Sequence, residues 1–215
     1  MLLLTPSKPW GFFYNKEIKI KVMRWKRISK GYIEEPLLDY LSKIFDEEMG
    51  NGYDLTVCVG TDSKRSGGGY KFATAIIIKV SENIGKDKFG RAINQGKGGI
   101  VIGSTYFDTS LKRGKEGVKE RMMREVSKTI EVAYEISPLL DLYNIKLEVH
   151  ADVNPDVKWE SNKALNEAVG YMLGMGYDFK VKPNAWAASS GADKLCWFFL
   201  YFFVFLKIYY IFIFK

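Results

Sequence analysis

The run Leu55-Thr-Val-Cys-Val-Gly60 is followed at once by Thr61 and Asp62. Its apolar residues, bounded by a glycine, predict a buried strand. A carboxylate directly after such a strand is unusual, because burying a lone charge costs several kcal/mol unless the charge is paired, neutralised or bound to a metal. Asp62 is therefore the residue from which we begin to infer both the fold and the site.

A second run, Ile145-Lys-Leu-Glu-Val-His-Ala-Asp152, predicts another strand that ends on an acid. The two strands can be neighbours at the centre of one sheet. Two neighbouring strands that each deliver an aspartate at the same end suggest that Asp62 and Asp152 share a bound cation.

The order of the expected elements defines the fold class. Two further strand-like runs join the first through a glycine turn at residues 66–69 and a flexible loop over residues 81–99, and helices then alternate with strands. This order predicts an α/β fold with a mixed sheet and helices packed on it. The expected elements are a helix over 34–48, strands over 55–60, 70–80 and 100–107, a helix over 115–136, the strand 145–152, a helix over 161–173, a strand over 177–182 and a helix from residue 185.

A long amphipathic helix over 115–136 supplies a third acid. At about 100° per residue, its apolar arc contains Glu125, whereas its other glutamates fall on the solvated side. We therefore expect Glu125 to face the sheet; the alternative is a boundary glutamate paired with Arg121 or Lys128. The arc consists of Val118, Met122, Val126, Thr129, Ala133 and Ile136.

Asp193 is the fourth candidate acid. It follows a run of small residues, Ala187-Ala-Ser-Ser-Gly-Ala192, that would allow a helix to lie close on the sheet. The alternative is an ordinary exposed aspartate. Three or four carboxylates on rigid elements suit Mg²⁺ or Mn²⁺, and two such ions about 4 Å apart can activate water and stabilise the leaving oxygen of a phosphodiester.

His150, Ser63 and Lys64 are auxiliary candidates near these acids. His150 is the one histidine of the chain and shares a strand face with Asp152, two residues on. It would assist proton transfer or position a phosphate, or else make only a structural hydrogen bond. Basic residues such as Lys64, Arg65 and Lys112 would hold phosphates.

Composition points to an anionic partner. The net charge of +7 favours nucleic acid first and an acidic membrane surface second, against a generic basic surface. Two cysteines far apart match no zinc spacing, and Cys58 is expected to be a small core residue in a reducing compartment. With no secretory signal evident at the N-terminus, we expect a cytoplasmic protein.

The tail after residue 195 has a different composition from the rest. Residues 196–214 are aromatic and aliphatic apart from Lys207, and their number approaches the roughly 20 residues that span a bilayer. A membrane anchor, an aggregation-prone extension and the read-through of a disrupted gene end are the three alternatives, of which we favour the last. Three segments are thus expected: an N-terminal extension with a helix over 1–50, a central domain over 51–195 and the tail 196–215.

Four short motifs occur along the chain: Gly60-Thr-Asp-Ser63, Glu120-Arg-Met-Met-Arg-Glu125, Glu148-Val-His-Ala-Asp-Val153 and Lys182-Pro-Asn-Ala-Trp-Ala-Ala-Ser-Ser-Gly-Ala-Asp193. Together they resemble the YkuK-type ribonuclease H-like family. The resemblance covers roughly residues 12–195 and implies a five-stranded mixed sheet with central acids that bind divalent metal. It implies that Asp62, Glu125, Asp152 and Asp193 are the metal ligands.

Two departures from the family pattern are visible: Asn184 replaces an expected aspartate, and the chain past Leu195 does not resemble a family C-terminus. The leading hypothesis is a metal-dependent nuclease acting on RNA, an RNA–DNA hybrid or structured DNA. The alternatives are a catalytically inactive nucleic-acid-binding module of the same fold and a membrane-anchored protein.

Overall fold

The computed structural model describes residues 23–111, 115–151, 177–181, 184–193 and 195–196, together with Gly170 and Gly174. Asp152, Lys112 and the tail after Cys196 lie outside the described residues, as does the expected helix over 161–173 apart from Gly170. The predicted features that fall there therefore stay predictions.

One mixed sheet of seven strands, in the order β2-β1-β5-β4-β3-β6-β7, organises the described residues. The pairs among the first five strands in this order are antiparallel, whereas β6 lies parallel to β3 and β7 parallel to β6. The strands are β1 (Trp25–Arg27), β2 (Gly31–Tyr32), β3 (Asp54–Ser66), β4 (Gly69–Lys86), β5 (Ala92–Asp108), β6 (Lys146–Ala151) and β7 (Asp178–Lys180).

The expectation of five strands is wrong, although the α/β class with a mixed sheet is confirmed. The five expected strands all exist, but β1 and β2 extend the sheet at the β5 edge. These two strands were missed because they are only three and two residues long, too short for an alternating pattern to be recognised.

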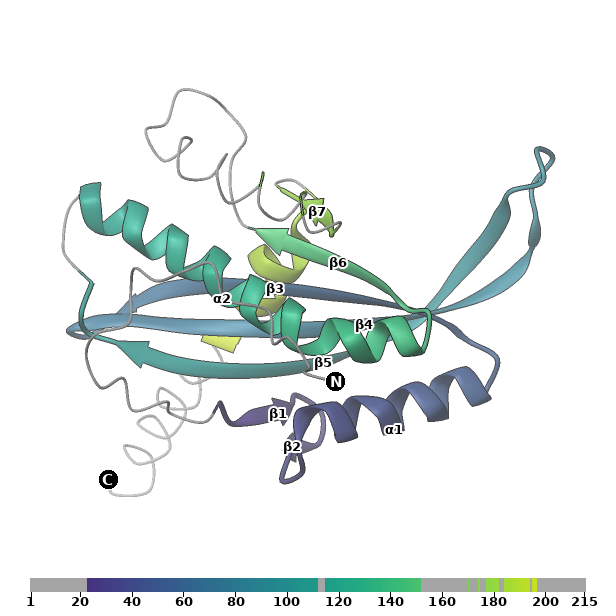
Figure 1. The fold of residues 1–215 in the computed structure, drawn as a ribbon, viewed down its shortest axis with the longest axis horizontal. Coiled ribbons are helices and arrows are strands. Elements are labelled where there is room, and N and C mark those ends of the chain that lie inside the picture. The colour runs from purple at the N-terminus through teal and green to yellow at the C-terminus, as the bar shows by residue number, and fades with distance from the viewer. Residues whose placement is uncertain are drawn as a thin grey trace, which may run out of the picture.

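The expected flexible loop over 81–99 is also wrong, because most of it belongs to a long hairpin. β4 continues to Lys86 and β5 begins at Ala92. Figure 1 shows this hairpin leaving the sheet at the right of the view. The ladder is irregular, with register shifts after Val80 and after Asn83, which is how paired strands accommodate glycines.

Helices cover the two faces of the sheet unequally (Figure 1). On one face, α1 (Leu37–Gly50) and α2 (Lys115–Leu142) bury the largest core, to which β3 contributes Val57 and Val59. On the other face, the π-helix η1 (Ala187–Ala192) packs against Cys58 and the alanines of β4. This division follows from strand geometry, since alternate residues of β3 point to opposite faces.

Gly60 lets η1 approach the sheet closely. A Cβ atom at this position would lie 2.5 Å from the backbone nitrogen of Ala188 and 2.9 Å from the carbonyl carbon of Ala187. The small-residue run before Asp193 therefore lies close on the sheet, as its composition predicts. None of the helices among the described residues is long and apolar enough to cross a membrane.

Candidate functional site

Asp62 lies within β3 rather than at its end, contrary to the expectation. β3 continues to Ser66 and pairs with β4 along that whole length. Among the described residues, the last pair of the parallel ladder with β6 is Thr61 with Ala151. Asp62 and Asp152 directly follow these two paired residues in the sequence.

Glu125 reaches β3 from α2, as helix phase predicts. It is 6% exposed, and its Oε1 accepts a hydrogen bond of 2.6 Å from the hydroxyl of Ser63. Arg121 lies one turn earlier, with its Nη1 3.4 Å from the same Oε1. Glu125 therefore fits both interpretations made from the sequence. Its side chain faces the sheet, and the same side chain is paired with Arg121.

Arg121 also binds Ser63 directly. Its Nη1 donates to the Ser63 carbonyl oxygen at 3.1 Å and to the Ser63 hydroxyl oxygen at 3.3 Å. Ser63, Arg121 and Glu125 thus form one buried or half-buried polar group beside Asp62. The sequence singled out each of these residues but not the contact between Arg121 and Ser63. The two residues are 58 positions apart, and a contact of such long range leaves no local sequence pattern.

Asp62 and Asp193 belong to the opposite face of the sheet. The β4 partner of Asp62 is Ala73, which packs in the same cluster as Ala187 and Cys196. The sulfur of Cys196 lies 3.8 Å from the Asp62 carbonyl oxygen. Asp193 directly follows η1 and is half-buried.

The thiol of Cys196 lies on the η1 face of the sheet. Burial is the main cause that raises the pKa of Cys196 to about 12; the negative charges of Asp62, Asp193 and Glu125 also raise it, and the charge of Lys71 lowers it. Asp62 and Asp193 thus belong to the η1 face of the sheet and Glu125 to the α2 face. Asp152 lies outside the described residues.

His150 is a core residue in this structure. It is fully buried, and its Nδ1 accepts a hydrogen bond of 3.0 Å from the Ala187 N–H at the start of η1. Its ring packs edge-on against Trp186, with centroids 5.4 Å apart. These contacts match the structural alternative that the sequence left open, and they fix where η1 begins.

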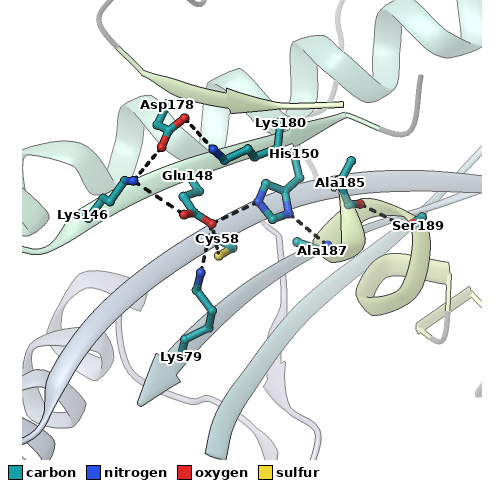
Figure 2. A network of polar contacts seen from close by, with 10 residues as sticks. All are labelled: Cys58, Lys79, Lys146, Glu148, His150, Asp178, Lys180, Ala185, Ala187 and Ser189. Atoms are coloured by element: carbon teal, nitrogen blue, oxygen red, sulfur yellow. Dashed lines mark hydrogen bonds and ion pairs between the residues drawn. The ribbon is translucent and has the colours of Figure 1, made fainter. Parts of the chain in front are cut away.

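Figure 2 shows that His150 belongs to a second polar cluster, centred on Glu148. Glu148 Oε2 accepts hydrogen bonds from Lys79 at 3.0 Å and from the Cys58 thiol at 3.3 Å. Lys146 lies 3.8 Å from Oε1. In the sequence, Glu148 stands out only as part of a motif. Its position two residues before His150 is the signal that could have identified it, because residues two apart on a strand share one face.

Protonation in this second cluster is set mainly by burial. Burial raises the pKa of the Cys58 thiol to about 12 and lowers the pKa of His150 despite the neighbouring carboxylate. For Glu148, burial would raise the pKa, but the hydrogen bonds from Lys79 and Cys58 outweigh it and the pKa is lowered. At neutral pH the cluster therefore holds a thiol, a neutral imidazole and an ionised carboxylate.

Cys58, Glu148 and His150 offer three ligand atoms that all lie within 4.8 Å of one another, a spacing that a metal ion can use. The hydrogen bond from Ala187 argues against that use. Because a backbone N–H only donates, His150 Nδ1 carries no proton and the neutral ring must carry it on Nε2. Nε2, which lies 3.4 Å from Glu148 Oε2, is then not free to ligate a metal.

A third polar contact anchors the start of α2 to the end of β5. Burial alone would raise the pKa of Asp108, but hydrogen bonds from Ser110 and the charge of Arg124 outweigh it, and the pKa is lowered. Arg124 pairs with Asp108 and with Glu120. This contact holds α2, and with it Glu125, against the sheet.

A mixed sheet in which β6 lies parallel to β3 and β7 parallel to β6, with helices on both faces, is an α/β arrangement consistent with the ribonuclease H-like class. The chain belongs to the Ribonuclease H-like family, whose model matches residues 38–196. The resemblance inferred from the sequence motifs is thereby confirmed. No curated protein and no solved structure gave a match.

Proposed function

We propose that the protein is a divalent-metal-dependent nuclease that hydrolyses phosphodiester bonds of nucleic acid. The observation that carries the proposal is the position of Asp62 between Thr61, which pairs with Ala151 of β6, and Ser63, which donates a hydrogen bond to Glu125. Membership of the Ribonuclease H-like family supports it, because acids placed around central strands suit metal-assisted hydrolysis.

The donor set fits a hard cation. Asp62, Glu125 and Asp193 offer only carboxylate oxygens, the ligands that Mg²⁺ and Mn²⁺ prefer. We expect Asp152 to add a fourth, since the residue before it pairs with the residue before Asp62. A bound ion of this kind supplies an activated water and a positive charge for the leaving oxygen.

Basic side chains lie next to the acids and would bind the substrate's phosphates. Lys64 and Arg65 follow Asp62 within two and three residues on β3, and Arg65 is exposed. Such contacts position the nucleic acid without reading its sequence. Lys112, which we also expect to bind phosphate, lies outside the described residues.

The test uses the full chain with Mn²⁺ or Mg²⁺ and three substrates: single-stranded RNA, an RNA–DNA hybrid and branched DNA. We expect cleavage that requires the metal. The cleavage rate should fall at least about 100-fold in Asp62→Asn, because the change replaces a negatively charged carboxylate ligand by a neutral amide. Asp54→Asn is the matched control, since Asp54 is exposed at the other end of β3. Equal loss in both variants, or none in Asp62→Asn, would refute the assignment.

A catalytically inactive nucleic-acid-binding module is the second candidate. It is favoured by the contacts of Glu125, whose Oε1 already accepts from Ser63 and lies beside Arg121. This alternative predicts binding that weakens with salt, without metal-dependent turnover and without Mn²⁺ binding in a titration.

Two further expectations stay predictions. A cytoplasmic location follows from the sequence argument alone. Membrane association would depend on the tail over 196–214, whose residues after Cys196 lie outside the described part of the chain; recovery of the full chain in the soluble fraction after cell fractionation would exclude it.

A further inference from the structure

The hairpin of β4 and β5 extends beyond the rest of the sheet as an arm, defined here as residues 82–97. The last β3 partner of β4 is Asp54, opposite Ser81, and the β1 ladder reaches β5 only as far as Ile102. Beyond these points β4 and β5 pair only with each other in the described sheet. Figure 1 shows the arm projecting away from the helices.

Both faces of the arm are open to solvent. Residues 83–86 and 88–99 are all exposed, including Ile84 at 56%, Phe89 at 69% and Ile93 at 42%. A two-stranded ribbon that packs on nothing is marginally stable in water, and exposed large hydrophobic residues on it mark a surface for a partner.

The charge of the arm identifies the chemistry of that partner. Residues 82–97 contain four cations and two acids, a net charge of +2, and the amides of Asn94 and Gln95 lie in the same stretch. Within the arm, Arg91 pairs with Asp87 at 2.8 Å and Lys97 with Glu82 at 2.6 Å. Lys88 and Arg91 lie over the ring of Phe89, at 5.1 Å and 5.2 Å from its centroid. The tip therefore presents an aromatic ring with cations on it, a combination that suits nucleic acid.

We propose that the arm enters the major groove of double-stranded DNA that the acid site holds for cleavage. This inference rests on the proposed function and specifies its substrate as duplex DNA. Paired strands lie about 4.8 Å apart, and the major groove of B-DNA, about 12 Å wide, admits a two-stranded ribbon. The major groove of duplex RNA is too narrow for it.

The distance from the arm to Asp62 sets a minimum length for the DNA. Ala73, the partner of Asp62, and Ser81, the last β4 residue paired with β3, are eight residues apart. At about 3.4 Å per residue this is about 27 Å, or about 8 base pairs. The seven residues from Ser81 to Lys88 add about 24 Å, so full contact needs about 15 base pairs.

The experiment measures binding by fluorescence anisotropy without divalent metal, so that it does not depend on cleavage. The variant is Lys88→Ala/Arg91→Ala, and the matched control is Lys30→Ala/Lys43→Ala, two exposed lysines away from the arm. For a 20-base-pair DNA we expect the arm variant to weaken Kd about 10-fold or more and to lower the salt slope by about 2. The control should change Kd less than about 3-fold.

Length and nucleic-acid type then distinguish the outcomes. For an 8-base-pair DNA and for a 20-base-pair RNA duplex, the arm variant should bind as the wild type does. Equal weakening on RNA and DNA, or on 8 and 20 base pairs, would overturn the proposal. So would an arm-dependent dimer in light scattering, because the exposed strands would then pair with a second copy.

Failure of this inference and failure of the proposed function are distinguishable. If Asp62→Asn binds the 20-base-pair DNA as tightly as the wild type and binding depends on the arm, the arm proposal holds even where no metal-dependent cleavage is found. If cleavage depends on Asp62 but the arm variant binds and cleaves as the wild type does, only the arm proposal is refuted.

Discussion

Replacing Gly60 by alanine should push η1 away from the sheet. The added Cβ would lie 2.5 Å from Ala188 N, and ordinary contact begins at 3.4 Å, so η1 must move by 3.4 − 2.5 = 0.9 Å. The atoms it meets are backbone, which cannot rotate away as a side chain can. The same movement would stretch the hydrogen bond from Ala187 to His150.

The size of the effect follows from these two losses. Overpacking costs about 1–3 kcal/mol, and the strained hydrogen bond about 0.5–1.5 kcal/mol. The lower unfolded-state entropy of alanine offsets about 0.4–1 kcal/mol. The net loss in the free energy of unfolding is about 1–4 kcal/mol, which corresponds to a Tm lower by roughly 2–16 °C for a chain of this size.

Thermal unfolding followed by circular dichroism measures this loss, with Gly96→Ala as the matched control. Gly96 also lies in a strand, but a Cβ there meets no atom within 4 Å, so its Tm should stay within about 2 °C of the wild type. A Gly60→Ala protein that unfolds with the Gly96→Ala control would refute the close approach of η1. Since η1 leads into Asp193, the variant should also bind Mn²⁺ more weakly under the proposed function.

Three further variants test the polar contacts. Ser63→Ala removes the 2.6 Å hydrogen bond to Glu125 and should lower the free energy of unfolding, measured in urea, by about 1.5–3 kcal/mol. Ser66→Ala, at the end of the same strand, is the control; an equal loss in both variants would contradict the importance of this hydrogen bond. His150→Phe leaves the Ala187 N–H without its acceptor and should cost about 1–3 kcal/mol, whereas His150→Asn, which can still accept from that N–H, should cost less; the reverse order in urea denaturation would count against the assigned contact. Asp108 has a lowered pKa in the folded state, so it stabilises the protein above the ordinary aspartate pKa and this stabilisation is lost as the pH falls below about 4. The Tm difference between wild type and Asp108→Asn should therefore shrink from pH 6 to pH 3, and a constant difference would exclude the ion pair as its cause.

Strand and helix periodicity predicted much of this fold from the sequence. The apolar run over 55–60 predicted a buried strand, in which Cys58 is a core residue, and the 3.6-residue period selected Glu125, which is buried on the sheet side. The same arc wrongly included Val118, which is 46% exposed. Periodicity assigns a face to a helix residue, but it does not say where along the helix the sheet stops.

Tertiary contacts decided the rest. Helical periodicity predicts a helix over 115–136, yet α2 continues past Pro138 to Leu142, where Leu140 is buried in the core at 1% exposure. The glycines and polar residues of the arm have low strand propensity and predict a loop; only the pairing of its two strands makes it a ribbon. Likewise, no sequence pattern shows that Thr61 pairs with Ala151.

The parallel pairing of β3 with β6 also bears on the order of folding. β3, β4 and β5 are joined by hairpins and can pair locally, whereas the contact from Cys58 to Glu148 spans 90 residues. Contacts of such long range tend to form late, after the entropy of closing a large loop has been overcome. The contacts of this β3 segment with the helices are also of long range, 62 residues from Ser63 to Glu125 and 134 from Asp62 to Cys196, so we expect them to form late as well. A cation bound by Asp62, Glu125 and Asp193 should slow unfolding and leave the folding rate almost unchanged.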